Sequence, residues 1–312
     1  MNFIVMTVFY STLFLSPFLV ISSSNIILMW LSLELGVFSF LPMINSSSQT
    51  AFSTAKYFFI QSIGSVMILA SSFHGFMTLS MSFIFIALML KLGMVPFHFW
   101  LPKVVSSLQT KEMLILLVWQ KVGPLFAIVS LPTFESSVKI FISLLSVSVG
   151  SILGLKQTQW RQIFTFSSIS HLGWIVMSSV VSFWLFFVYF LTYAVSLLQI
   201  FLFNNKQSSN SSSFFFTGMN LFNLLMLLSL AGLPPMLGFL MKMMVLFYFM
   251  SSPMMILILF VMISFSVVSM FFYLKIYFSL SLFSLGSELS RNKLFIVSNI
   301  LIFFSFPLLI NF

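Results

Sequence analysis

The chain is a succession of apolar runs, most of them about as long as a bilayer is thick, separated by short polar stretches. About 20 residues of α-helix cross the ~30 Å hydrocarbon core of a membrane. Eleven runs are candidates for such helices, near residues 3–21, 25–43, 55–73, 76–99, 111–130, 138–155, 162–180, 181–203, 217–248, 254–283 and 294–311. This pattern predicts an all-α polytopic membrane protein, with residues 1–312 forming a single membrane domain.

The composition excludes several other classes of protein. With 60% hydrophobic and 5% charged residues, the chain does not resemble one or two soluble domains. Its net charge of +9 does not indicate a nucleic-acid partner, because most basic residues fall in short loops between the apolar runs. The chain has no cysteine and no Gly-x-Gly turn, so cysteine-ligated clusters and the dinucleotide-binding motif are excluded. We therefore expect any redox cofactor to belong to another subunit.

Basic residues are concentrated in alternate loops, which predicts the topology. Loops after even-numbered runs carry Lys56, Lys103, Lys111, Lys156, Arg161, Lys206, Arg291 and Lys293, whereas loops after odd-numbered runs carry only Lys139. The positive-inside rule then places the N-terminus on the positive side and, after eleven crossings, the C-terminus on the opposite side. The first run has no signal- or transit-peptide pattern and is expected to be a retained spanning helix.

Two of the runs contain helix breakers. The fourth run carries Gly93 and Pro96 near its end, and the ninth carries Pro234 and Pro235 in its middle. Unbroken, the ninth would be about 48 Å long, too long for a bilayer without strong tilt. Proline removes a backbone donor and clashes with the preceding turn, so helices four and nine are predicted to be discontinuous. Such breaks indicate a transporter of two related halves, approximately residues 1–130 and 138–283, followed by a final helix at 294–311.

Four ionisable residues lie at mid-membrane depth. Glu34 is the only charge in its run, and Lys91, Lys121 and Lys242 occupy similar depths in others. On insertion scales an isolated charge at a helix centre costs roughly 2.5–3.5 kcal/mol, so a chain that retains one usually requires it. These residues are the primary candidates for a functional site.

Their chemistry indicates proton handling, with a structural alternative for each lysine. Burial disfavours the ammonium form of a lysine, so Lys121 could gain and lose a proton at working pH, whereas an arginine could not. Lys91 precedes the Gly93/Pro96 break and is expected to meet Glu34 as a switchable pair. The alternatives are a permanent ion pair that fastens helices, and for Lys242 a lysine that snorkels to the interface.

Two histidines are secondary candidates. His171 lies in mid-run with Ser167, Trp174 and Ser178 on one helical face, which could line water. A neutral imidazole bonded to serine or backbone explains the same pattern equally well. His98 follows Lys91 by seven residues and would share its face if Pro96 did not intervene.

Several sequence blocks occur in the order of a known family. They are Trp-x-x-Leu-Glu at 30–34, AKYFFIQSIGS (55–65), KLGMVPFHFW (91–100), WQKVGP (119–124), GLKQTQWRQIFTFSSISHLGW (154–174) and AGLPPMLGF (231–239). On these blocks the chain resembles, almost end to end, the antiporter-like subunit 2 of the mitochondrial NADH:ubiquinone oxidoreductase (respiratory complex I) in its animal form.

The resemblance implies a proton-translocating subunit of the membrane arm, with Glu34 and Lys91 as a coupled pair, Lys121 as central relay and Lys242 as distal lysine. It implies that this chain holds no cofactor and that NADH, FMN, iron–sulfur clusters and ubiquinone belong to partner subunits. The expected partners are other membrane-arm and accessory subunits and the lipid bilayer, with cardiolipin as a candidate lipid.

The implied location is the mitochondrial inner membrane, with the N-terminus in the matrix and the C-terminus in the intermembrane space. Full-length relatives have fourteen helices, so eleven implies the animal form that lacks the first three.

The chain departs from the family pattern at two positions. Lys103 stands where an acid is usual, which is expected to alter only loop charge, and Met241 replaces a proline before Lys242, which bears on the break geometry. Two rival functions share these features, a stand-alone cation/proton antiporter and a purely structural scaffold whose charges only fasten helices.

Overall fold

The secondary structure is helical throughout the described part of the chain. The computed structural model describes residues 3–44, 48–73, 77–130, 136–204, 221–233, 236–249 and 261–269. Within these ranges, seven helical stretches are long and apolar enough to cross a membrane. The elements are α1 (Phe3–Ser22), α2 (Ile26–Ile44), α3 (Ser48–Phe73), α4 (Met77–Leu92), η1 (Phe97–Phe99), α5 (Trp100–Val105), α6 (Thr110–Leu114), η2 (Ile115–Trp119), α7 (Gln120–Ser130), α8 (Ser136–Lys156), α9 (Trp160–Val181), α10 (Phe183–Asn204), α12 (Leu221–Ala231) and α13 (Leu237–Phe249).

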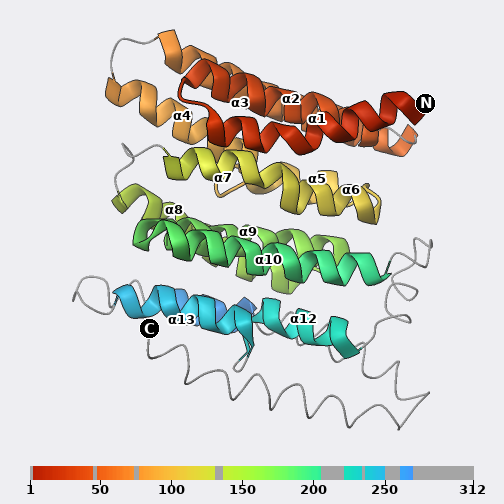
Figure 1. Ribbon diagram of the computed structural model, residues 1–312. Helices are drawn as coiled ribbons and strands as arrows, with labels where there is room; N and C mark the ends of the chain where they lie inside the picture. Colours follow the sequence, from red (N-terminus) through yellow and green to blue (C-terminus); the bar gives the residue numbers. More distant parts are fainter. Residues whose placement is uncertain are drawn as a thin grey trace.

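The helices follow one another across the molecule in chain order. In Figure 1, α1 to α4 form one edge, α5 to α10 the middle, and α12 and α13 the next layer. Helix α7 contacts α1, α2 and α4, while α13 contacts both α9 and α10. The arrangement confirms an all-α membrane fold for the described residues, and it places α7, α9 and α10 between the two broken helices.

The predicted boundaries hold within a few residues for most spans, but the third was wrong at its start. It was expected at residue 55, whereas α3 begins at Ser48. The polar stretch does not end the helix, and within it the Thr54 hydroxyl donates to the Ala51 carbonyl at 2.7 Å, so this side chain is satisfied inside the helix. The predicted span 294–311, most of 254–283, and the basic residues Lys206, Arg291 and Lys293 lie outside the described residues.

The predicted break in the fourth span is confirmed. Helix α4 ends at Leu92, and the chain resumes as η1 and α5 only at Phe97. Gly93 has φ 69°, the left-handed region that glycine adopts most easily. A Cβ at this position would lie 2.9 Å from Cδ1 of Leu101, so the leucine side chain would have to shift, whereas the backbone conformation itself favours glycine.

The ninth predicted span is also divided. Helix α12 ends at Ala231 and α13 begins at Leu237. The turn between them starts at Gly232, which has φ 77°. Pro234 and Pro235, from which the break was predicted, lie outside the described residues.

The fifth span contains an interruption that was not predicted. A continuous helix was expected over 111–130, but a π-helical segment, η2, separates α6 from α7. A π segment widens the turn and shifts the register of everything after it, and such segments are frequent at functional sites. Lys121 lies two residues after the end of η2.

Small residues bring α8 and α9 into close contact. A Cβ added to Gly150 would lie 2.8 Å from the backbone nitrogen of Ser170, and one added to Gly173 would collide with Ser143 and Ser146. Such small-residue contacts let helices approach closely in a membrane, where packing replaces hydrophobic driving force. This contact fixes α9, which carries His171 and Trp174, in the interior of the helical array.

Candidate functional site

Glu34 and Lys91 meet as an ion pair. The Nζ atom of Lys91, one residue before the end of α4, lies 3.7 Å from Oε2 of Glu34 in the middle of α2. Their side chains are 12% exposed for Glu34 and 2% for Lys91. Gly64 of α3 makes room for the lysine, since a Cβ there would lie 3.1 Å from Cγ of Lys91. The predicted meeting of these two residues is therefore confirmed as a contact.

The mutual attraction of this pair does not by itself offset the cost of burying both charges. Two unit charges this far apart attract by about 4 kcal/mol at an effective dielectric constant of about 20, while the desolvation penalty is several kcal/mol per ion. Loss of either charge would thus leave the other buried without compensation. A change in protonation at one residue must be felt strongly by the other.

A small cavity lies between Lys91 and Lys121. The cavity is about 20 Å³ in volume and is lined by polar groups of Gln61, Lys91, Gln120 and Lys121, together with Tyr57 and apolar side chains. This volume is sufficient for about one water molecule, for which ~10–15 Å³ is the minimum. The Gln61 amide also donates to the Lys91 carbonyl at 3.1 Å, which satisfies a backbone group freed at the break. The two lysines therefore border one space that a water could bridge.

Lys121 stands at the junction of η2 and α7 and is buried. Its neighbours anchor this junction, since Trp119 Nε1 donates to the Leu13 carbonyl at 2.9 Å and Gln120 Nε2 to the Gly36 carbonyl at 2.9 Å. Among the described residues, the Lys121 ammonium has no hydrogen-bond partner. Its nearest compensation is the ring of Tyr193, whose centroid is 5.9 Å away.

Lys242 turns inward onto the break between α12 and α13. Its Nζ donates to the Ala231 carbonyl at 3.3 Å and lies 5.9 Å from the ring centroid of Trp174. The carbonyl belongs to the C-terminal end of α12, where the helix dipole favours a positive charge. The alternative of a lysine snorkelling to the interface is wrong, because Lys242 is only 5% exposed.

His171 is buried in α9 and pairs with α10. Its Nδ1 atom lies 3.3 Å from the Tyr189 hydroxyl. Of the partners expected from the sequence, a backbone group is present at Leu230, whereas the hydroxyls of Ser167 and Ser178 donate to carbonyls of their own helix. His98 is buried in η1 with its ring 4.1 Å from that of Phe99. It is not among the residues that line the cavity between Lys91 and Lys121.

Sequence reasoning missed four polar residues of the site. Gln61 and Gln120 could have been found by the argument that selected Glu34, because each is a polar side chain within an apolar run. Tyr189 and Tyr193 carried no comparable signal, since both lie in an aromatic-rich run and only packing brings them to His171. Within the described ranges, no group of three or more His, Cys, Asp or Glu residues could hold a metal ion.

Comparison with known proteins identifies relatives of this chain. Residues 72–269 match the family described as NADH:quinone oxidoreductase/Mrp antiporter, transmembrane. NADH-ubiquinone oxidoreductase chain 2 of Lumbricus terrestris is 36% identical over 286 residues, which cover 86% of this chain and 84% of the relative. The Mus musculus protein of the same name is 32% identical over 303 residues, or 90% of this chain and 88% of the relative.

Solved structures share the fold at lower identity. A chain of respiratory complex I from Thermus thermophilus superposes with a TM-score of 0.74 at 20% identity, covering 86% of this chain and 69% of that chain. A chain of the Mrp complex from a Dietzia species gives 0.71 at 14% identity, covering 88% and 65%. At these identities the likeness concerns the fold alone.

Proposed function

The chain belongs to the NADH-ubiquinone oxidoreductase chain 2 family, and from this membership we propose that it translocates protons in the membrane arm of respiratory complex I. It is a subunit of NADH:ubiquinone oxidoreductase and a multi-pass membrane protein. NADH oxidation and ubiquinone reduction take place in partner subunits, which hold the FMN and iron–sulfur clusters. The observation that carries the proposal is the cavity that Lys121 shares with Lys91, the residue that is itself paired with Glu34.

The first half of the mechanism is an electrostatic switch. A charge change in a neighbouring subunit alters the pairing of Glu34 with Lys91, which lie 3.7 Å apart. A Lys91 released from Glu34 repels a proton on Lys121 across the cavity that both line. Because Lys121 has no ionic partner among the described residues, its proton affinity responds directly to this field.

The second half carries the proton from Lys121 toward Lys242 and out. His171 lies on α9, which contacts both α5 and α13, and its ring is 5.2 Å from that of Tyr193, the ring near which Lys121 lies. Lys242 receives the proton at the C-terminal end of α12, where the Ala231 carbonyl stabilises its charged form. Because the helix is broken here, the Ala231 carbonyl is available to the lysine, whereas in a continuous helix it would accept a backbone hydrogen bond.

The finer organisation follows the same proposal. Eleven spanning helices form two related halves, 1–130 and 138–283, each with one broken helix, and a final helix at 294–311. The protein lies in the mitochondrial inner membrane among other membrane-arm subunits, with its N-terminus in the matrix and its C-terminus in the intermembrane space. The broken helices α4/α5 and α12/α13 support this division.

The decisive test replaces Lys121 with methionine, which keeps the length of the side chain and removes the proton-binding amine. In the assembled complex, reconstituted in liposomes, we expect Lys121→Met to lower the ratio of protons pumped to electrons transferred. Assembly should be retained, because the ammonium has no hydrogen-bond partner among the described residues to lose. The ratio is measured from NADH oxidation and internal acidification in the same vesicles.

The matched control is Lys111→Met, on the exposed surface of α6 at one end of the same span. It removes the same charge outside the buried chain and should leave the ratio normal. A normal ratio in an assembled Lys121→Met complex would show that protons do not pass through this residue.

A further inference from the structure

The structure leaves a gap between Lys121 and Lys242 that no lysine or acid of the described residues fills. Lys121 borders the small cavity shared with Lys91, but neither Lys121 nor Lys242 is among the residues lining a second, larger cavity. This second cavity is about 200 Å³ in volume and lies between α10 and the α12/α13 pair. Its lining is mostly apolar, and its polar residues are His171, Tyr189, Thr192, Tyr193, Ser196 and Ser229.

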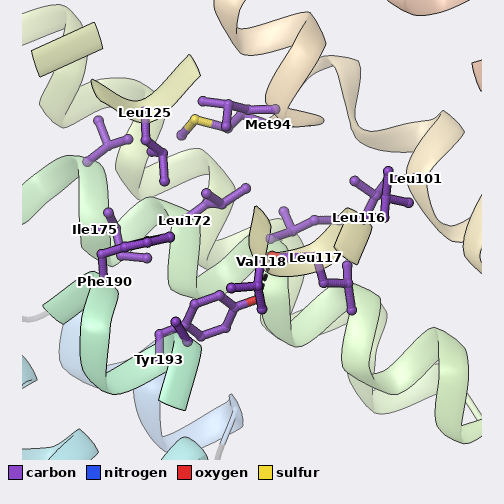
Figure 2. Packing of buried hydrophobic residues seen from close by; sticks show 14 of the residues in the cluster. Met94, Leu101, Leu116, Leu117, Val118, Leu125, Leu172, Ile175, Phe190 and Tyr193 are labelled. Atoms are coloured by element: carbon purple, nitrogen blue, oxygen red, sulfur yellow. Dashed lines mark hydrogen bonds between the residues drawn. The ribbon is translucent and has the colours of Figure 1, made fainter. Parts of the chain in front are cut away.

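Tyr193 lies between the two cavities. Figure 2 shows its ring extending from α10 toward the η2 residues Leu117 and Val118, with a dashed line to η2. Its hydroxyl donates to the Leu117 carbonyl over a long 3.5 Å. The Lys121 ammonium lies 5.9 Å from the centroid of this ring, and the His171 ring 5.2 Å from it. One aromatic side chain therefore holds the central lysine and the histidine.

Tyr189 lies one helical turn earlier on the same helix and contacts the same histidine. Its hydroxyl is 3.3 Å from Nδ1 of His171, and both residues line the second cavity. A phenol can give a proton to Nδ1 while taking one from water, so it passes a proton without changing its own charge. The cavity beside it, about 200 Å³ in volume, is mostly apolar, so the water that serves the phenol would have to bind at its few polar residues, among them Thr192, Ser196 and Ser229.

We propose that Tyr189 relays protons to His171 on the way from Lys121 to Lys242, and that Tyr193 is the positioning residue that holds Lys121 and His171 beside each other. The inference rests on the proposed proton-translocating function. The two tyrosines act through different groups, Tyr189 through its hydroxyl and Tyr193 through its ring. Sequence position alone gives no reason for such a difference.

The test uses this difference in assembled complexes reconstituted in liposomes. Tyr189→Phe keeps the ring and removes the hydroxyl, and we expect a severalfold lower proton-to-electron ratio. Tyr193→Phe keeps the ring that contacts Lys121 and His171 and should pump nearly normally, whereas Tyr193→Leu should lower the ratio. Rescue by phenylalanine at position 193 but not at 189 is a pattern that simple loss of packing would not give. Tyr10→Phe, on the exposed side of α1, is the control for the exchange itself.

The outcomes separate this inference from the proposed function. If Lys121→Met lowers the ratio and Tyr189→Phe does not, the relay through Tyr189 is refuted while proton translocation stands. Equal ratios for Tyr193→Phe and Tyr193→Leu would refute the positioning role in the same way. Should Tyr189→Phe fail to assemble, His171→Gln provides the second measurement, because glutamine still bonds to the hydroxyl but takes up no proton. A normal ratio in that variant would overturn the relay.

Discussion

At the scale of single residues, the buried ionisable groups differ in how their charge is compensated. Lys91 has a carboxylate at 3.7 Å, and Lys242 has a helix-terminal carbonyl at 3.3 Å. Lys121 has only an aromatic ring at 5.9 Å among the described residues. The charge of Lys121 is therefore the one most easily altered by its surroundings. That is the property a central relay needs, because a strongly paired lysine would hold its proton.

The Glu34–Lys91 pair can be tested by a double-mutant cycle. Glu34→Gln and Lys91→Met should each destabilise the subunit by about 3–5 kcal/mol, because each leaves an uncompensated buried charge. The double variant should recover much of this stability, since two neutral side chains replace the pair. We nevertheless expect pumping to stay low in the double variant. Thermal unfolding of the complex gives the stabilities, and reconstituted vesicles give the proton-to-electron ratio.

The stability and the proton-to-electron ratio together distinguish an ion pair that acts as a switch from one that only holds helices together. A double variant that is stable and pumps normally would mean that the charges only hold helices together. If the double variant is no more stable than the single variants, other charges must also interact with Glu34 or Lys91, and the two residues do not compensate each other alone. Gln61→Leu is a useful control, because it removes a polar group from the same cavity without changing charge.

At the scale of elements, the sequence predicts breaks where a residue enforces them and misses breaks that packing enforces. Gly93 and Pro96 disrupt a helix by their own covalent structure, so the interruption after α4 could be predicted. Segment η2, with the sequence ILLVW, contains no breaker and reads as ordinary helix. Its wider turn leads directly into Trp119 and Gln120, whose side chains bond to carbonyls of α1 and α2. Contacts over more than 80 residues of sequence are not visible in a local pattern.

The break after α12 gives an element-scale prediction. Gly232→Ala should strain a residue at φ 77° by about 1–2 kcal/mol. Its Cβ would also lie 2.7 Å from Nζ of Lys242 and so displace the ammonium from the Ala231 carbonyl. We therefore expect a lower proton-to-electron ratio as well as lower stability. Stability is measured by thermal unfolding of the complex and the proton-to-electron ratio in reconstituted vesicles, as for the Glu34–Lys91 pair.

A second cycle shows whether this effect acts through the lysine. If Gly232→Ala works by displacing Lys242, it should add little to the pumping defect of Lys242→Met. If the pumping defects of Gly232→Ala and Lys242→Met add, Gly232→Ala acts through another part of the turn and not through Lys242. Gly93→Ala serves as the control for strain, because its Cβ would meet Leu101 instead of a lysine.

At the scale of the whole molecule, one contact agrees with the alternation of basic loops, whereas the tertiary contacts between spans could not be predicted. The alternation of basic loops places Ser106 and Arg161 on one side, and the Arg161 guanidinium donates to the Ser106 carbonyl at 3.1 Å. The position of Lys121 in the middle of an apolar run could be read directly, because it depends only on distance along the chain. The sequence did not show that Lys121 would lie beside α10, since the neighbours of a spanning helix depend on side-chain fit. The tyrosines of α10 therefore emerged only from the structure.

The absence of cysteine makes the topology directly testable. Thr158→Cys lies between α8 and α9, and Ser24→Cys between α1 and α2, both at exposed positions. We expect a membrane-impermeant maleimide to label Thr158→Cys only in inside-out vesicles of the inner membrane and Ser24→Cys only in mitoplasts. The unmodified chain has no cysteine and supplies the blank, while denaturing detergent should expose both sites to label. Labelling of both from one side would require an even number of crossings between residues 24 and 158. That result would break the alternation of basic loops on which the orientation rests, because the positive-inside rule assigns these two loops to opposite sides.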